Sequence, residues 1–233
     1  MVPSLCLIIP AYNEAGAIAA TLARVPRVIE GADQVTIAVV DDGSLDGTAE
    51  IVRGCGDSRV VLMRHLANRG LGGALGTGLA YAKLHGFDYV ITYDADGQHA
   101  PEDIAVVLGP LAAGTADAVI GSRMISGEGM PLRRTLGNWG LSLITSLLFG
   151  LHSTDSQSGL RGFSRRAIEG ISLRTDRMEV SSEFIKQIHD LRLRYAEVPI
   201  RSIYTSYSLA KGQRSVNVVS ILLRLLVHAL MEK

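Results

Sequence analysis

Apolar and amphipathic segments alternate through the first half of the chain. The apolar runs predict strands at residues 4–10, 35–44, 59–65, 88–96 and 116–123. The segments between them have helical spacing and predict helices at residues 14–29, 45–55, 71–86 and 101–114. Pro101 suits the start of the last of these helices. Strands that alternate with helices indicate an α/β fold with a mostly parallel sheet and helices on both faces.

The second half of the chain is less regular. Its pattern predicts a loop at 126–131, a helix at 132–151, a polar loop over 155–168, a helix at 181–194 and a strand at 195–200. Residues 204–215 are rich in hydrogen-bond donors and lack apolar periodicity. With no internal repeat or linker, we expect one domain over 1–215 and an amphipathic C-terminal helix over 216–233.

Composition narrows the class of protein. Hydrophobic residues make up 47% and charged residues 20% of the 233 residues, as in a globular protein with a full core. The formal net charge is zero, so nothing in the overall charge indicates a nucleic-acid partner. Residues 1–120 hold 7 Lys/Arg and 14 Asp/Glu, whereas residues 121–233 hold 16 and 9. This asymmetry predicts two surfaces with different partners.

Cysteine usage and hydropathy bear on location. Two cysteines, Cys6 and Cys55, form neither a disulfide framework nor a zinc site, which favours a reducing, cytoplasmic compartment. The first residues lack the basic region of a signal peptide. No uncharged apolar run reaches the ~18 residues of a membrane span. The sequence therefore predicts a cytoplasmic protein that could bind the inner membrane face only peripherally.

Polar clusters fall at the ends of the predicted strands, as "PAYNE", "DDGS", "DAD" and "GSR". Ligands of parallel sheets collect at these carboxyl ends. Asp94 and Asp96 alternate on one strand, so their side chains point the same way and repel unless a cation lies near. With Gln98 they offer two or three hard oxygen ligands. Such a set suits Mg²⁺ or Mn²⁺ whose shell is completed by substrate phosphates, although a solvated turn is the alternative interpretation.

Other polar and glycine residues near these strand ends can be explained by structure rather than by ligand binding. Asp41 is predicted to be structural, facing away from Asp42, and His99 to be a turn residue rather than a ligand. The glycine cluster of 68–78 could cradle a phosphate at a helix N-terminus. Close packing of Gly72, Gly73 and Gly76 is at least as good an explanation, since the cluster matches neither the P-loop nor the dinucleotide fingerprint.

The motifs occur in a recognisable order: "IIPAYNE", "VVDDGSLDGT", "NRGLGGALGTG", "DADGQHAPED", "GSR" and "DSQSGLRGF". In this order they resemble family-2 glycosyltransferases of the GT-A fold, a Rossmann-like α/β architecture. Within that family the chain looks most like the dolichyl- and polyprenyl-phosphate mannose or glucose synthases. The resemblance runs from residue 4 to about residue 200.

The resemblance implies a nucleotide-sugar donor and assigns roles to individual residues. The residues expected to hold its base and ribose are Pro10, Tyr12, Glu14, Val40 and Asp42. Those expected at the metal and diphosphate are Asp94, Ala95, Asp96 and Gln98. Arg123 and Arg134 are expected to meet phosphates.

The acceptor is the open question. Relatives that glycosylate hydroxyls need a general base, and Asp155 could serve as one. A phosphate monoester is already ionised near neutral pH, because its second pKa is about 6, and needs only charge compensation. The basic second half offers Arg133, Arg134, Lys211 and Arg214 for that purpose. Arg161 is equally well explained as an ion-pair partner of Asp155 or as a phosphate ligand.

Together with these residues, the resemblance implies an inverting, metal-dependent transferase that moves a hexose from GDP-mannose or a UDP-hexose to a polyprenyl phosphate. The alternatives are transfer to a saccharide hydroxyl and a non-catalytic nucleotide-sugar-binding module. Residues 216–233 are expected to contact a membrane surface, to pack on the domain, or to join a second copy in a homo-oligomer. The segment "SLAKGQRS" departs from the family's usual "R-x-x-G-x-S-K-L" pattern.

Overall fold

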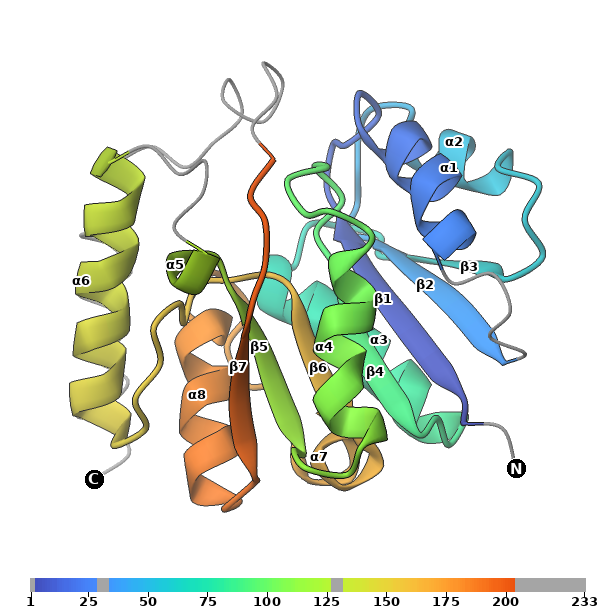
Figure 1. The fold of residues 1–233 in the computed structure, drawn as a ribbon. Coiled ribbons are helices and arrows are strands. Elements are labelled where there is room, and N and C mark those ends of the chain that lie inside the picture. The colour runs from blue at the N-terminus through green and yellow to red at the C-terminus, as the bar shows by residue number, and fades with distance from the viewer. Residues whose placement is uncertain (1–2, 29–33, 127–131, 204–233) are drawn as a thin grey trace.

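The computed structural model describes residues 3–28, 34–126 and 132–203, within which it contains one sheet flanked by helices (Figure 1). The strands are β1 (Leu5–Ala11), β2 (Val35–Asp41), β3 (Val60–Arg64), β4 (Tyr89–Thr92), β5 (Ala118–Ser122), β6 (Arg161–Ser164) and β7 (Tyr195–Pro199). The helices are α1 (Ile18–Val28), α2 (Thr48–Arg53), α3 (Leu71–Leu84), α4 (Asp103–Ala112), α5 (Arg123–Ser126), α6 (Leu132–Phe149), α7 (Arg165–Gly170) and α8 (Val180–Asp190).

The sheet has the order β3-β2-β1-β4-β6-β5-β7. Strand β6 runs antiparallel to β4 and β5, and the other neighbours are parallel. The predicted α/β fold with a mostly parallel sheet is therefore confirmed. Because β6 is reversed, its first residue, Arg161, lies beside Thr92 of β4 and Ile120 of β5, near the carboxyl ends of the parallel strands.

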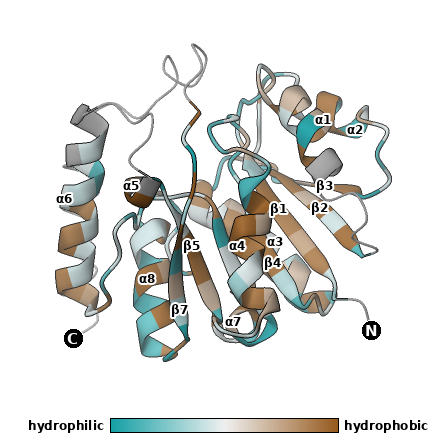
Figure 2. Ribbon diagram, in the orientation of Figure 1, coloured by the Kyte–Doolittle hydropathy of each residue, from teal (hydrophilic) through white to brown (hydrophobic). Residues whose placement is uncertain are grey.

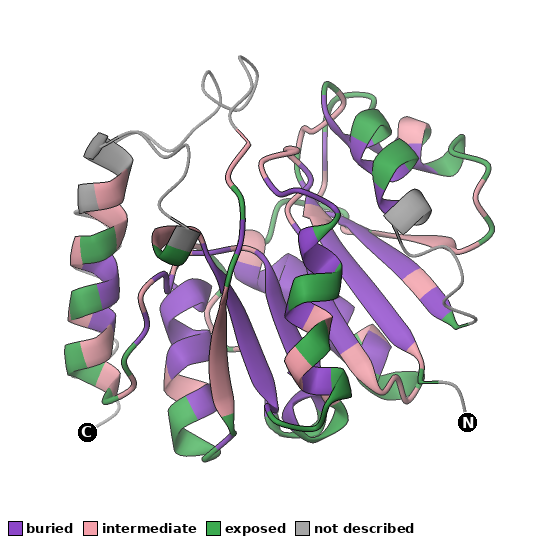
Figure 3. Ribbon diagram, viewed as in Figure 1, coloured by how far each residue is buried: buried purple, intermediate pink, exposed green. Residues whose placement is uncertain are grey.

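Alternation along the strands builds a core on each face of the sheet. In β1, Leu7 and Ile9 pack with α1 and α4, whereas Cys6 and Ile8 pack with α3 and α8. Figure 1 shows α4 in front of the sheet and α3 behind it, and Figure 3 shows that the central strands are buried along most of their length. Near-continuous apolar strands are the pattern of a sheet covered on both sides.

The segment 155–168 was predicted as a polar loop, and this prediction is wrong in part. Residues Arg161–Ser164 form β6, and Arg165–Gly170 form α7. The four residues of β6, "RGFS", are too few and too mixed to show a strand pattern. Gly162 is needed because a Cβ there would come within 2.7 Å of Val107 of α4.

Helix α6 stands at one end of the molecule and packs against α8. Its buried side includes Ser142 and Thr145, which hydrogen-bond Ser156 and Ser182. Trp139 is 58% exposed and therefore lies outside the core. Figure 2 shows apolar residues along this helix. No helix within the described residues is long and apolar enough to cross a membrane.

The glycine cluster serves packing at the start of α3. The N–H groups of Gly72 and Gly73 donate to the carbonyl oxygen of Asp176, at 2.8 and 3.3 Å. A Cβ at Gly72 would lie 1.8 Å from the carbonyl oxygen of Thr175, whereas a Cβ at Gly76 would meet no atom within 4 Å. Packing thus explains Gly72 but not Gly76, and the N–H groups of Gly72 and Gly73 are already bonded to Asp176.

Gly72→Ala is expected to lower the free energy of unfolding by about 1–3 kcal/mol, because backbone rather than a flexible side chain must move to admit the methyl group. Gly76→Ala on the same helix is the matched control. It should raise stability by about 0.5–1 kcal/mol, since alanine loses less conformational entropy in a helix. Urea denaturation measures both changes, and equal effects of the two substitutions would contradict the packing role.

Candidate active site

The loops that follow β1 and β2 are tied to each other at the carboxyl edge of the sheet. Asn13, whose φ is 53°, donates its N–H to Ser44 Oγ at 2.9 Å and accepts the N–H of Leu45 at 2.9 Å. The N–H of Glu14 donates to Thr48 Oγ1 at 2.8 Å. Asn is one of the few residues that tolerate a left-handed backbone. Of the predicted base and ribose contacts, Tyr12, Glu14 and Asp42 therefore lie in two loops that are hydrogen-bonded to each other, whereas Pro10 and Val40 lie in the strands that lead into them.

The predicted donor contacts at this edge of the sheet differ in exposure. Tyr12 is 41% exposed and Pro10 is partly buried, while Val40 is fully buried in the core. Ala95 is also buried, and its carbonyl oxygen accepts a hydrogen bond from Thr21 of α1 at 3.1 Å. Tyr12 and Pro10 are thus the residues among these four that present surface to a ligand.

Asp41 and Asp42 have different partners. Asp41 is fully buried, and its carboxylate accepts the N–H of Ser44 and lies 3.0 Å from Arg64 Nε, which agrees with the structural role predicted for it. Asp42 faces the other way and receives several donors.

The carboxylate of Asp42 accepts from His65 Nδ1 at 2.7 Å, from the N–H of Arg69 at 2.9 Å and from the N–H of Gly70 at 2.7 Å. His65 also bonds Thr77 of α3 through Nε2 at 2.9 Å. The geometry gives Asp42 the role of holding the 65–70 loop on α3, and its contact with a donor stays a prediction. His65 was not identified from the sequence, although it follows β3 at the same edge.

The "DAD" segment leaves the sheet at the end of β4. The carboxylate of Asp96 accepts from Gln98 twice, from the side-chain Nε2 at 2.6 Å and from the backbone N–H at 3.0 Å. Asp94 Oδ2 lies 3.1 Å from Nε2 of His99, which is buried against Tyr93. Asp94 itself keeps 36% of its side chain exposed. His99 is therefore more than a turn residue, because it supports Asp94 from behind.

The two carboxylates of this segment have pKa values that move in opposite directions. Desolvation pushes the pKa of Asp94 up. The hydrogen bond from His99 and the positive charges of His99, Arg161 and Arg123 outweigh it, so the pKa lies below its usual range. Desolvation, followed by the charge of Asp94, raises the pKa of Asp96 above its usual range. The negative charge of Asp96 is thus the less well compensated of the two.

This donor set fits a divalent metal. The described residues contain no group of three or more His, Cys, Asp or Glu side chains arranged to hold a metal, so the site is not a closed cage. Asp94 and Asp96, with Gln98 beside them, supply a few hard oxygen atoms on one side. Mg²⁺ and similar ions are held in this way when substrate phosphates and water complete the shell.

The turn that contains Gly159 packs against the carboxylate of Asp94. Thr92 Oγ1 donates to the carbonyl oxygen of Gly159 at 2.7 Å, which holds this turn on β4. Arg161 is 1% exposed; its guanidinium donates to Ser181 Oγ at 2.8 Å and lies 5.0 Å from the ring centroid of Phe184. The shortest described hydrogen bond of the Arg161 guanidinium is therefore to Ser181, and its interaction with Asp155 is through charge rather than through a described hydrogen bond. A phosphate contact of Arg161 stays a prediction.

Burial lowers the pKa of Arg161 to about 10, against the stabilising charges of Asp94 and Asp155. The side chain is therefore still a cation at neutral pH. A buried cation needs nearby negative charge. Arg161 thus interacts through its charge both with Asp94 of the "DAD" segment and with Asp155 of the Arg123–Asp155 pair.

Gly159→Ala is expected to disable the predicted metal site. A Cβ at this position would lie 2.0 Å from Asp94 Oδ2, so the carboxylate must rotate or shift. We expect Mn²⁺ affinity, measured by calorimetry in the presence of UDP or GDP, to fall at least about tenfold, as for loss of a residue that orients a ligand. Gly137→Ala, where a Cβ meets nothing within 4 Å, is the control. Unchanged Mn²⁺ affinity in Gly159→Ala would remove Asp94 from the metal site.

Arg123 and Asp155 form a buried, bidentate ion pair at the end of β5. Arg123 Nε and Nη2 lie 2.7 and 2.8 Å from the two oxygens of Asp155, and the N–H of Arg123 also donates to Oδ2 at 3.1 Å. The side chain of Asp155 is 0% exposed and that of Arg123 is 15% exposed. The residue considered as a general base is thus engaged by Arg123, and its role in this conformation is to orient that arginine.

Arg134 is the third residue of α6, which begins near the carboxyl edge of the sheet in Figure 1. The structure describes the backbone of Arg134 but not its side chain. Lys211, Arg214 and the predicted helix over 216–233 lie outside the described residues. The phosphate contacts assigned to these residues stay predictions.

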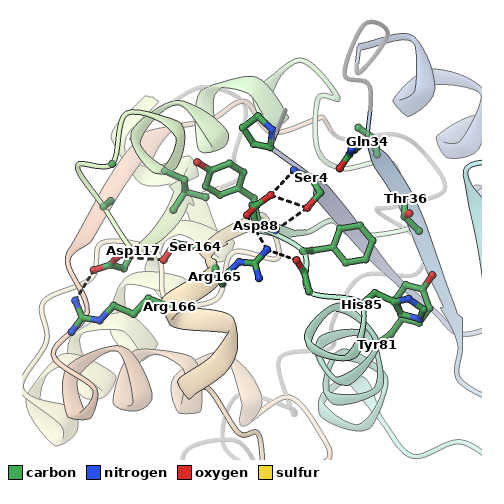
Figure 4. Close-up of a pocket in the computed structure, with 18 of the residues that line it drawn as sticks. Ser4, Gln34, Thr36, Tyr81, His85, Asp88, Asp117, Ser164, Arg165 and Arg166 are labelled. Atoms are coloured by element: carbon green, nitrogen blue, oxygen red, sulfur yellow. Dashed lines mark hydrogen bonds and ion pairs between the residues drawn. The ribbon is translucent and has the colours of Figure 1, made fainter. Parts of the chain in front are cut away.

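A separate hollow of about 990 Å³ lies at the opposite edge of the sheet (Figure 4). None of the residues assigned to donor or metal lines it. Its charged side chains pair with each other: Arg165 with Asp88, and Arg194 and Arg166 with Asp117. The hollow therefore lacks the chemistry found at the carboxyl edge.

The comparison with protein families decides the class. Residues 6–171 match the family model described as glycosyl transferase family 2. The chain belongs to that family. This glycosyltransferase is 40% identical over 240 residues to the UDP-N-acetylglucosamine–dolichyl-phosphate N-acetylglucosaminyltransferase of Methanococcus voltae, covering 95% of the chain and 94% of the relative. It is 36% identical over 171 residues to the undecaprenyl-phosphate mannosyltransferase of Micrococcus luteus, covering 71% and 68%.

Solved structures show the same fold for this glycosyltransferase. Glucosyl-3-phosphoglycerate synthase from Mycobacterium tuberculosis with phosphoglyceric acid superposes with a TM-score of 0.70 at 23% identity, covering 95% of the chain and 79% of the other. The same enzyme with Mn²⁺, UDP-glucose and phosphoglyceric acid gives a TM-score of 0.67 at 21% identity, with the same coverage. The GT-A fold implied by the sequence motifs is therefore confirmed.

Proposed function

We propose that this glycosyltransferase moves a hexose from a nucleotide sugar to a polyprenyl phosphate, with inversion at the anomeric carbon and with a divalent metal. The observation that carries the proposal is the engagement of Asp155 by Arg123. The carboxylate considered as a general base is occupied, and an arginine lies near the metal-binding carboxylates. An acceptor phosphate is already ionised and needs such a cation rather than a base.

The residues divide the chemistry as follows. Asp94 and Asp96, with Gln98, would hold Mg²⁺ or Mn²⁺, which offsets negative charge on the leaving nucleoside diphosphate. An oxygen of the acceptor phosphate attacks the anomeric carbon as the bond to the donor's diphosphate breaks on the opposite face. The product is a β-linked lipid phosphosugar when the donor is α-linked. Arg123, held by Asp155, would stabilise phosphate charge in the transition state.

The relatives support the acceptor class more than the donor. The names of the M. voltae and M. luteus proteins both specify a polyprenol-type phosphate acceptor, but one transfers N-acetylglucosamine and the other mannose. GDP-mannose and UDP-hexoses are therefore both candidate donors. The exposed Tyr12 and the partly buried Pro10 are the positions at which a base would be met.

Arg134→Ala separates the two acceptor classes. An arginine can hold a phosphate by two parallel hydrogen bonds, and bonds to charged groups are worth about 1.5–3 kcal/mol each. We expect transfer to polyprenyl phosphate to fall about ten- to a hundredfold, with Arg134→Lys recovering part of the loss. Donor affinity, measured by calorimetry with Mn²⁺, should stay near that of the wild type because Asp94 and Asp96 are untouched.

Arg166 on α7 provides a control for the loss of a surface arginine, since its side chain is 60% exposed and lies at the opposite edge of the sheet. Arg166→Ala should leave transfer unchanged. Full transfer to polyprenyl phosphate by a folded Arg134→Ala protein would reject the role of Arg134.

A further inference from the structure

Glu197, in the edge strand β7, collects four hydrogen bonds from two segments of the chain. Its Oε1 accepts from Tyr195 Oη at 2.7 Å, from Ser153 Oγ at 2.8 Å and from the N–H of Thr154 at 2.9 Å. Its Oε2 accepts from Thr154 Oγ1 at 2.7 Å. Burial and the charge of Glu197 raise the pKa of Tyr195, so its hydroxyl stays a donor. One carboxylate thus fixes both the backbone and the side chain of Thr154.

Thr154, which Glu197 holds, lies next to the ion pair between Arg123 and Asp155. The next residue is Asp155, whose carboxylate holds Arg123. Thr154 Oγ1 also lies 2.7 Å from Oγ of Ser122, the residue that precedes Arg123. The two partners of the buried ion pair are therefore each preceded by a residue of one hydrogen-bonded network, and Glu197 is the carboxylate in that network.

We propose that Glu197 is a positioning residue for the transfer reaction: through Thr154 it places Asp155 so that the Arg123 guanidinium faces the phosphates. This inference rests on the proposed function for its effect on rate. A misplacement of about 1 Å caused by a residue remote from the reacting atoms can cost about a hundredfold in rate. Glu197 itself touches neither Arg123 nor the metal-binding residues in its described hydrogen bonds.

Strands β5 and β7 are also linked at their other end, and that link provides a control for a general loss of stability. Asp117 immediately precedes β5, is 3% exposed, and accepts two hydrogen bonds from the side chain of Arg194, which precedes β7. Asp117 therefore ties β5 to β7 as Glu197 ties the 153–155 loop to them. It does so at the opposite edge of the sheet from Arg123.

Glutamine at position 197 distinguishes hydrogen bonding from charge. Its amide oxygen can take the place of Oε1 and accept the same three bonds. Its NH₂ can take the place of Oε2 and donate to Thr154 Oγ1, which then donates to Ser122 Oγ. Glu197→Gln therefore keeps the network and removes the charge, whereas Glu197→Ala removes both.

The experiment compares Glu197→Ala, Glu197→Gln and Asp117→Ala. We expect Glu197→Ala to lower kcat about ten- to a hundredfold with little change in the KM for the donor. Glu197→Gln should retain most of the rate. Asp117→Ala should lower the melting temperature while leaving kcat, measured well below that temperature, at the wild-type value. In an Arg123→Ala background, Glu197→Ala should lower the residual rate by less than about twofold, because residues of one network are not additive.

Hydrogen–deuterium exchange separates this inference from the proposed function. In Glu197→Ala, the amides of residues 122–126 and 151–156 should exchange faster than in the wild type, and in Asp117→Ala they should not. If the wild type fails to use polyprenyl phosphate, the proposed function fails, and the exchange pattern still decides the role of Glu197. Unchanged exchange in Glu197→Ala, full additivity with Arg123→Ala, or an equal loss of rate in Glu197→Gln would each overturn the inference.

Discussion

Asp96→Asn is expected to lower kcat by about a hundred- to a thousandfold while the protein stays folded. Asp96 is the less compensated of the two carboxylates after β4, and a bound metal supplies several kcal/mol of charge stabilisation, at 1.36 kcal/mol for each factor of ten. Asparagine keeps the shape of the side chain and removes its charge. Steady-state transfer assays with Mn²⁺ measure the loss.

Excess chelator should bring the wild type down to a similar residual rate and should change the rate of Asp96→Asn little. Asp57→Asn is the control, because Asp57 is paired with Arg59 in a surface loop before β3. It should lose stability slightly and keep its activity. A wild type that works at full rate in excess chelator would reject a metal at Asp94 and Asp96.

Arg123→Ala should lower transfer at least about a hundredfold, since it removes a guanidinium whose hydrogen bonds to charged groups are worth about 1.5–3 kcal/mol each. It should also lower the free energy of unfolding by about 3–5 kcal/mol, because it leaves the fully buried Asp155 without its partner. Loss of activity and loss of stability are therefore expected together in this variant.

The double variant Arg123→Ala/Asp155→Asn separates the two losses. Removing the unpaired charge should restore much of the stability, whereas activity should stay as low as in Arg123→Ala. Urea denaturation and transfer assays on the same preparations measure both. If activity returned together with stability, Arg123 would be only a structural partner of Asp155.

The sequence predicted the layers of the fold and the edge at which the site lies. Apolar strands that end on "PAYNE", "DDGS", "DAD" and "GSR" place polar residues at the carboxyl edge, because parallel strands end at the same side of a sheet. The exception in the sheet is β6, whose four residues carry too little pattern and whose direction depends on pairing with β4 and β5.

Contacts between distant segments could not be predicted in the same way. Asp155 was a candidate general base because it is a carboxylate. Only the structure shows that its carboxylate is hydrogen-bonded to Arg123, which lies 32 residues earlier in the chain. His99 was predicted to be a turn residue. Its contact with the Asp94 carboxylate depends on the packing of its ring against Tyr93, which the sequence does not reveal. Residue types give the candidate chemistry, whereas packing decides which candidates are occupied.

Mass spectrometry of the reaction products tests the central claim most directly. The wild type is incubated with Mn²⁺, a short polyprenyl phosphate and, in turn, GDP-mannose, UDP-glucose or UDP-N-acetylglucosamine, and in parallel with the free polyprenol or a saccharide in place of the phosphate. We predict that one donor yields the polyprenyl phosphate carrying one sugar, β-linked by NMR, and that no donor modifies the acceptors without phosphate. Transfer to the polyprenol or saccharide hydroxyl, with none to the polyprenyl phosphate, would contradict the account.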